Sequence, residues 1–131
     1  MTPEAEVKVA LKKRLEDLGL YYFMPVQTGY GQRTLDFLVC GFSHFYGIET
    51  KAPGEVPTFQ QDCVAARIIA AGGIVYVIDN VEAAARFDPH NPHVSRPYTP
   101  PRGLRFDPGR GDFVLDRVGA RDQRLHGGGP D

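Results

Sequence analysis

The chain has little of several features that mark the class of a protein. Its 131 residues include two cysteines and no tryptophan, and its formal net charge is −1. No apolar run approaches the roughly 20 residues that span a bilayer, and the first residues form no apolar signal region. Cys40 and Cys63 lack the spacing of a metal-binding pair, so both are expected to be buried free thiols. We therefore expect a soluble, intracellular protein of the cytoplasm that does not associate with membranes.

Signature motifs of several enzyme classes are missing as well. The sequence contains no phosphate-binding P-loop, no dinucleotide-binding glycine fingerprint and no serine-nucleophile elbow. Its four histidines are dispersed and form no ligand cluster. A net charge near zero argues against a protein that coats nucleic acid, because such a protein needs many phosphate contacts. An enzyme that grips a few phosphates locally remains compatible with this composition.

Apolar periodicity and turn residues predict one compact core at residues 1–87. A capped, proline-containing start and an apolar stripe predict a first helix that ends at Gly19. The predicted elements after it are strands at Leu20–Val26, Leu35–Cys40 and Phe45–Lys51, a helix at Phe59–Ala71, a strand at Ile74–Ile78 and a helix at Val81–Phe87. A helix that connects the third strand to the fourth makes that pair parallel, whereas the earlier hairpins are antiparallel. The expected fold is α/β, with a mixed central sheet flanked by helices in the order α-β-β-β-α-β-α.

The composition changes at Asp88. Residues 88–131 contain no lysine and few aliphatic residues, and their seven arginines stand against six aspartates. Proline, glycine and arginine dominate this segment, so it has little apolar surface to bury. We expect a C-terminal tail that is largely extended or disordered, with a weak strand at Asp112–Asp116.

The stretch of the chain that carries most chemical information contains two carboxylates and a lysine. Asp36 lies in an otherwise apolar strand, and Glu49-Thr50-Lys51 ends the next strand. Side chains alternate along a strand, so Glu49 and Lys51 point to the same side, and Asp36 joins them if the strands are neighbours. Two close carboxylates repel each other, and a divalent cation removes that repulsion. The pattern indicates a metal site for phosphodiester chemistry, to which the Thr50 carbonyl can add an oxygen ligand.

These residues also have plainer interpretations. Asp36 can be a strand-edge residue that caps the loop containing Gly29 and Gly31. Glu49 and Lys51 can form a solvated ion pair that contributes little to stability. A Glu-x-Lys triplet alone is nearly uninformative. The combination of that triplet with Asp36, a buried-looking strand and a following Pro/Gly loop favours the metal site.

Further polar residues lie on either side of this stretch. Glu4 suits the positive end of a helix dipole, and Gln60-Gln61 can be ordinary helix surface or can orient a water or a phosphate. Arg33 follows a glycine-containing turn, which can bind phosphate through its backbone and the guanidinium or can be a flexible turn only. The candidate nucleic-acid-binding residues are Arg33, Lys12 and Arg67.

Taken together, these residues resemble the VRR-NUC family of the PD-(D/E)xK, or restriction-endonuclease-like, nuclease superfamily. The resemblance covers residues 4–87, and its most specific part is Ile48–Gly54 followed by Gln61. Glu4 fits the first-helix glutamate of the family better than Glu6 does, and Gln61 fits its glutamine better than Gln60. The chain departs from the family at Leu35, where the family often has proline; this departure concerns the loop geometry more than the activity.

The resemblance implies a Mg²⁺- or Mn²⁺-dependent DNA endonuclease that hydrolyses phosphodiester bonds, with a preference for branched or junction DNA. The implied catalytic residues are Lys51, Glu49, Asp36, Gln61 and Glu4, with Asp36, Glu49 and Thr50 holding the metal. Stand-alone phage members of the family often act as dimers, so we expect a homodimer, in the host cytoplasm if the protein is phage-encoded. The alternative is a non-catalytic nucleic-acid-binding or phage assembly protein that keeps the nuclease fold.

Overall fold

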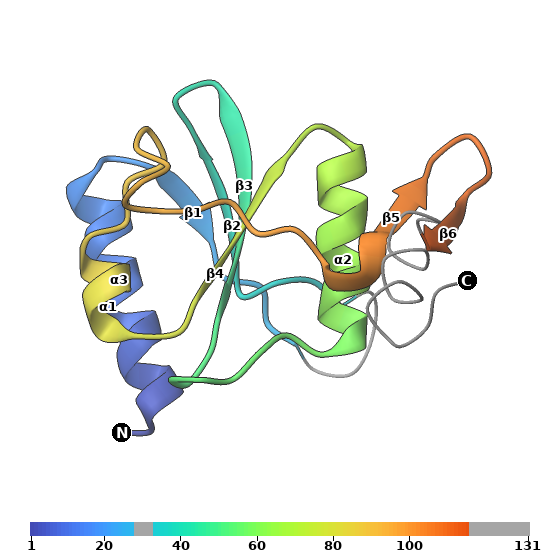
Figure 1. The fold of residues 1–131 in the computed structure, drawn as a ribbon. Helices are drawn as coiled ribbons and strands as arrows, with labels where there is room; N and C mark the ends of the chain where they lie inside the picture. Colours follow the sequence, from blue (N-terminus) through green and yellow to red (C-terminus); the bar gives the residue numbers. More distant parts are fainter. Residues whose placement is uncertain (28–32, 116–131) are drawn as a thin grey trace.

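The computed structural model describes residues 1–27 and 33–115. Within them, a four-stranded sheet lies between helices on its two faces (Figure 1). The strands β1 to β4 are Tyr21–Phe23, Phe37–Gly41, His44–Thr50 and Ile74–Ile78, and the helices are α1 (Pro3–Asp17), α2 (Phe59–Ala70) and α3 (Val81–Ala85). The loop with Gly29 and Gly31 and the chain beyond Leu115 lie outside the described residues.

The strands lie side by side in chain order, β1-β2-β3-β4. The β1–β2 and β2–β3 pairs are antiparallel, and the β3–β4 pair is parallel because α2 returns the chain to the other end of the sheet. This topology confirms the predicted mixed sheet. Phe42 and Ser43 close the β2–β3 hairpin with φ angles of 52° and 64°, the positive values that a two-residue hairpin turn requires.

The starts of α1 and α2 are fixed by side-chain caps. The Thr2 hydroxyl accepts a hydrogen bond from the Ala5 amide at 3.1 Å, and the Thr58 hydroxyl accepts one from the Gln61 amide at 3.2 Å. Each bond satisfies an amide that has no partner within its helix. The first turns of both helices are therefore held in place. No helix in the described part of the chain is long and apolar enough to cross a membrane.

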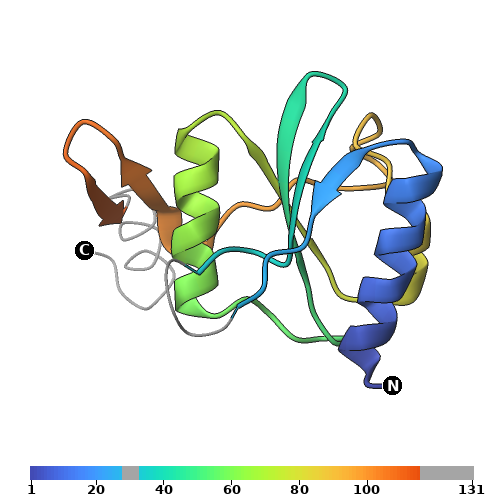
Figure 2. The same cartoon turned by 180° about the vertical axis from the view of Figure 1, so that it is seen from behind.

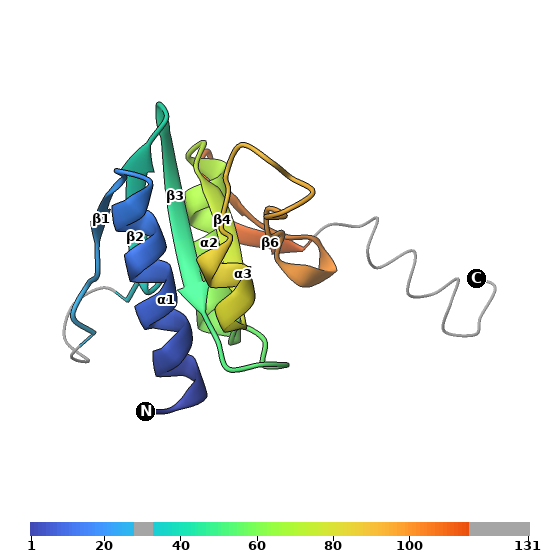
Figure 3. The same ribbon diagram turned by 90° about the vertical axis from the view of Figure 1, so that its left-hand side faces the viewer.

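The two faces of the sheet are covered by different helices. Figures 2 and 3 show α1 and α3 together on one face and α2 on the other. The larger apolar core lies beneath α1 and α3 and includes Val7, Leu11, Leu15, Phe37, Val39, Ile48 and Phe87. The smaller core beneath α2 is formed by Leu35, Ala65 and Val75. Gly47 allows α2 to approach closely, since a Cβ there would lie 2.8 Å from Ile68 Cδ1.

On the α2 side, the part of the sheet formed by β1 and β2 carries exposed side chains. Tyr21 of β1 and Cys40 of β2 are paired in register, and both are exposed. The expectation that Cys40 is buried was therefore wrong. Its neighbour Val39 points to the opposite face and is buried in the larger core, because side chains alternate along a strand. Cys63 in α2 is partly buried, and neither thiol forms a disulfide.

The chain beyond Phe87 packs against α2 and β4. The Tyr98 amide donates to the Val75 carbonyl at 2.6 Å, and the Tyr98 hydroxyl donates to Asp62 Oδ1 at 2.5 Å. A 3-10 turn (Pro101–Gly103) then leads to an antiparallel hairpin of β5 (Leu104–Asp107) and β6 (Asp112–Leu115). The sequence predicted a largely extended tail with one weak strand. Apolar content alone did not indicate this packing, because a few contacts with α2 anchor the segment.

We predict that Tyr98→Phe destabilises the protein. Asp62 is 7% exposed, and the substitution removes the hydroxyl that donates to its carboxylate, at an expected cost of about 1–3 kcal/mol. Urea unfolding of the full chain measures this loss. Tyr21→Phe, at an exposed position, is the matched control and should leave the midpoint unchanged. Equal midpoints for the two variants would contradict the anchoring role of Tyr98.

Candidate functional site

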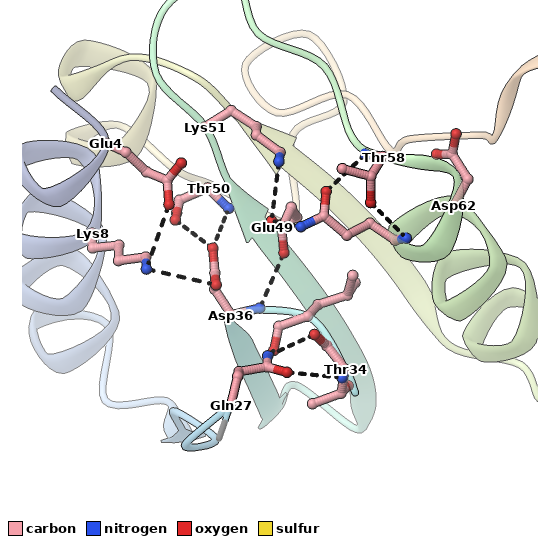
Figure 4. Close-up of polar contacts among 12 residues, drawn as sticks. Glu4, Lys8, Gln27, Thr34, Asp36, Glu49, Thr50, Lys51, Thr58 and Asp62 are labelled. Atoms are coloured by element: carbon pink, nitrogen blue, oxygen red, sulfur yellow. Dashed lines mark hydrogen bonds and ion pairs between the residues drawn. The ribbon is translucent and has the colours of Figure 1, made fainter. Parts of the chain in front are cut away.

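A cleft of about 560 Å³ opens where the end of β3 meets the first turns of α1 and α2. Glu4 and Lys8 line it from α1, and Thr58, Gln60 and Gln61 line it from the start of α2. Asp36, Glu49 and Lys51 line it from the sheet (Figure 4). The structure thus brings together all five residues that the resemblance implies to be catalytic.

Asp36 immediately precedes β2 and is held by the neighbouring strand β3. Its Oδ2 atom accepts hydrogen bonds from the Thr50 amide at 3.0 Å and from the Thr50 hydroxyl at 2.7 Å. Its own amide donates to Glu49 Oε1 at 3.3 Å. The β2–β3 register, in which Phe37 pairs with Ile48, places Asp36 beside Glu49. Both the backbone and the side chain of Asp36 are therefore fixed to the carboxyl end of β3.

Glu49 is a buried carboxylate with three polar neighbours. Its side chain accepts a hydrogen bond from Gln61 Nε2 at 2.7 Å as well as the one from Asp36, and Lys51 Nζ lies 3.7 Å from its Oε2 atom. Burial, together with the negative charge of Asp36, raises the pKa of Glu49 from 4.5 to about 7, while the positive charge of Lys51 opposes this rise. A cation close to Glu49 and Asp36 would relieve both effects.

Gln61 connects the start of α2 to Glu49. Its Oε1 atom accepts a hydrogen bond from the Thr58 amide at 2.9 Å, which completes a capping box with the Thr58 hydroxyl. Its Nε2 group donates to Glu49. Gln60 also lines the cleft but is exposed. The structure places Gln61, rather than Gln60, on the buried carboxylate.

Lys8 is a site residue that the sequence did not single out. Its ammonium lies 3.7 Å from Asp36 Oδ1 and 3.6 Å from Glu4 Oε2 (Figure 4). The signal in the sequence was the four-residue spacing from Glu4 to Lys8, which places both on one helix face. That spacing is common on helix surfaces, and only the packing of α1 against the sheet brings Lys8 to Asp36. Glu6 does not line the cleft.

The candidate nucleic-acid-binding residues occupy three different places. Arg33 lines this cleft and also a second one beside it. Arg67 lines only the second cleft, and its guanidinium lies 5.2 Å from the centre of the Phe106 ring. Lys12 is exposed on α1 and lines neither cleft. The contribution of Lys12 to binding stays a prediction from the sequence.

The oxygen donors of the cleft suit a hard divalent cation. In the described part of the chain, no group of three His, Cys, Asp or Glu side chains is arranged to hold a metal. Asp36 and Glu49 supply two carboxylates, and Mg²⁺ is often bound by one or two carboxylates with waters completing its shell. Burial and the repulsion from Asp36 raise the pKa of Glu49, and a bound cation would offset the cost of the charged form. The Thr50 amide and hydroxyl orient Asp36. That the Thr50 carbonyl is a metal ligand stays a prediction from the sequence.

The raised pKa of Glu49 predicts a specific dependence of stability on pH in chelator. The folded protein holds the Glu49 proton up to about pH 7, whereas the unfolded chain releases it near 4.5. The stabilisation is complete below the lower value and is lost as the pH rises through the higher one. Glu49→Gln should therefore gain stability relative to the wild type over this range. Denaturant unfolding between about pH 4 and pH 8 measures the difference, with Glu6→Gln as the control; parallel curves for all three proteins would contradict the shift.

Comparison with known proteins identifies the fold that carries this cleft. The chain matches no protein-family model and no curated protein. It does match a solved structure described as "VRR_NUC domain", with a TM-score of 0.56 and 22% sequence identity. The match covers 64% of this chain and 91% of that one. The chain therefore has the fold of a VRR_NUC domain, the restriction-endonuclease-like α/β fold that its motifs predicted.

Proposed function

We propose that the protein is a nuclease that hydrolyses phosphodiester bonds in DNA with the help of Mg²⁺ or Mn²⁺. The observation that carries this proposal is the meeting of Asp36, Glu49 and Lys51 in one cleft. Glu49 is buried beside a second carboxylate, which is an unfavourable arrangement without a cation. The VRR_NUC name of the structural neighbour supports the same reaction class.

Each residue of the cleft has a separate role in the proposed reaction. Asp36 and Glu49 would hold the metal, which would lower the pKa of a water and offset negative charge on the phosphate. Lys51 carries a positive charge 3.7 Å from Glu49, where it can orient the attacking water and stabilise the charge that develops on the phosphate oxygens. Gln61 and Thr50 hold the two carboxylates in position. Glu4 acts at longer range, through a water.

Two features of the surroundings favour a phosphate as the ligand. The first turns of α1 and α2 line the cleft, so the positive ends of two helix dipoles point toward it. Arg33 lines the same cleft and can pair with a phosphate next to the one that is cut. A purely DNA-binding surface has no use for buried carboxylates opposite a phosphate, so the enzyme is favoured over the non-catalytic alternative.

A preference for branched or junction DNA and a homodimeric state are inferred from the resemblance to VRR-NUC nucleases alone, and so are a phage origin and the host cytoplasm as its location. An oxygen-rich site suits both Mg²⁺ and Mn²⁺. A panel of labelled single-stranded, duplex, flap and four-way-junction DNAs, incubated with each metal and with chelator, tests substrate and metal together.

Lys51→Ala should reduce cleavage by on the order of 10²-fold or more, because the variant loses a charge that acts in the transition state. The measurement is initial cleavage rate on the best DNA of the panel. Lys13→Ala is the matched control, since Lys13 is exposed and pairs with Asp17 on the outer surface of α1. Full activity of folded, nuclease-free Lys51→Ala protein would contradict the proposed function.

Gln61→Ala should lower cleavage by roughly 10- to 100-fold, because it removes the group that holds Glu49 in place. The matched control is Gln60→Ala, which changes the neighbouring exposed residue of the same cleft. Gln61 also caps α2, so rates are measured well below the midpoint of thermal unfolding of each variant. Equal rates for the two variants would show that Gln61 serves only as a helix cap.

A further inference from the structure

The face of the sheet beside α2 carries a row of exposed aromatic rings. Tyr21 of β1 pairs in register with Cys40 of β2, which pairs with Phe45 of β3, so the three side chains lie in one line across the sheet. Tyr21 is 71% exposed and Phe45 is 43% exposed. Phe23, two residues along β1 from Tyr21, points to the same side and is 54% exposed. In Figure 2 the strand β1 lies on the near side of the sheet, with α2 to the left of the sheet and α1 to its right.

A second cleft of about 600 Å³ lies between this row and α2. Leu38 and Phe45 form its sheet side, and Val64 and Ile68 form its α2 side. Its charged lining residues in the described part of the chain are Arg33 and Arg67, so its lining is apolar with two guanidinium groups. No carboxylate is among these residues. The cleft thus combines apolar surface with positive charge.

The second cleft continues into the candidate active site. Arg33, Thr34 and Val64 line both. A chain that places one phosphate beside Asp36 and Glu49 would therefore have its next nucleotides at Arg33 and then over Phe45 and Tyr21. Bases stack on exposed aromatic rings whatever their sequence, and arginine pairs with the phosphates between them. Bases within a duplex are already stacked on each other and cannot do this.

We propose that Tyr21, Phe23 and Phe45, with Arg33 and Arg67, form a binding surface for the unpaired nucleotides of a DNA strand next to the phosphodiester that is cut. This inference rests on the proposed nuclease function and specifies its substrate: DNA with a single-stranded segment at the cleavage site. A second copy of the chain is a less suitable occupant. A two-fold dimer joins the same patch on both subunits, which would bring the arginines of both copies into one apolar interface.

The first test measures binding without cleavage. Full-length Lys51→Ala protein in chelator is titrated against a fluorescently labelled single-stranded oligothymidine and against a blunt duplex of equal length, and anisotropy is recorded. Adding Tyr21→Ala and Phe45→Ala should weaken single-strand binding by about tenfold or more, since each substitution removes a ring on which a base stacks. Binding to the blunt duplex should change less than twofold. Unchanged single-strand affinity would overturn the proposal.

Two further variants separate stacking from general packing. Phe42→Ala is the matched control, because Phe42 is 41% exposed but its ring packs against His90 at 4.1 Å between ring centres. Tyr21→Leu with Phe45→Leu keeps apolar volume and removes the rings, which also protects the test against misfolding of the alanine variant. An oligonucleotide containing 2-aminopurine should lose fluorescence on binding Lys51→Ala protein and keep it with the added leucine substitutions. Equal quenching by both proteins would overturn the stacking role.

The same experiments distinguish the two proposals. If the wild type cuts no DNA but the aromatic substitutions abolish single-strand binding, the nuclease function fails and the binding surface stands. If the wild type cuts DNA and the aromatic substitutions leave single-strand binding and cleavage unchanged, the binding surface fails and the nuclease function stands. A change of sedimentation mass in the aromatic variants, without a change in DNA affinity, would identify a second copy as the occupant and overturn the inference.

Discussion

The antiparallel pairing of β2 with β3 is the constraint on which the candidate site depends. It places Asp36 beside Glu49, and the two residues then bind each other's strands: the Asp36 amide donates to Glu49, and the Thr50 amide and hydroxyl donate to Asp36. A shift of one residue in this register would send Glu49 to the opposite face of the sheet. Two carboxylates are therefore kept close together by backbone pairing, although their charges repel.

The remaining contacts of the site keep Glu49 in this unfavourable position. Gln61 reaches it from α2, and the capping box with Thr58 fixes the start of that helix. One residue further along, Asp62 accepts the hydrogen bond of Tyr98, which is itself held on the edge of β4. The segment after Phe87 thus braces the helix that carries Gln61. The C-terminal segment is connected to the candidate site through α2.

Much of the fold follows from local patterns in the sequence. The strand at Ile74–Ile78 was predicted with its observed bounds, and the parallel β3–β4 pair follows from the helix between those strands. The strand β6 at Asp112–Leu115 agrees with the weak strand predicted at Asp112–Asp116. Its partner β5 was not foreseen, because its contact with α2, where Arg67 lies over Phe106, is non-local. Cys40 was expected to be buried because it lies in an apolar strand, yet it is exposed. The sequence of a strand does not reveal which of its faces a helix covers.

The sequence alone determined the order of the elements and the chemistry available to the site. The sequence predicted that one site contains Asp36, Glu49 and Lys51. Side chains alternate along a strand, and a short hairpin between two strands leaves few other arrangements. Tertiary packing decided three features that the sequence did not show. These are the position of Lys8 against Asp36, the raised pKa of Glu49, and the exposure of Tyr21 and Phe45. These depend on how far each helix extends over the sheet, and that is set by contacts between residues distant in the chain.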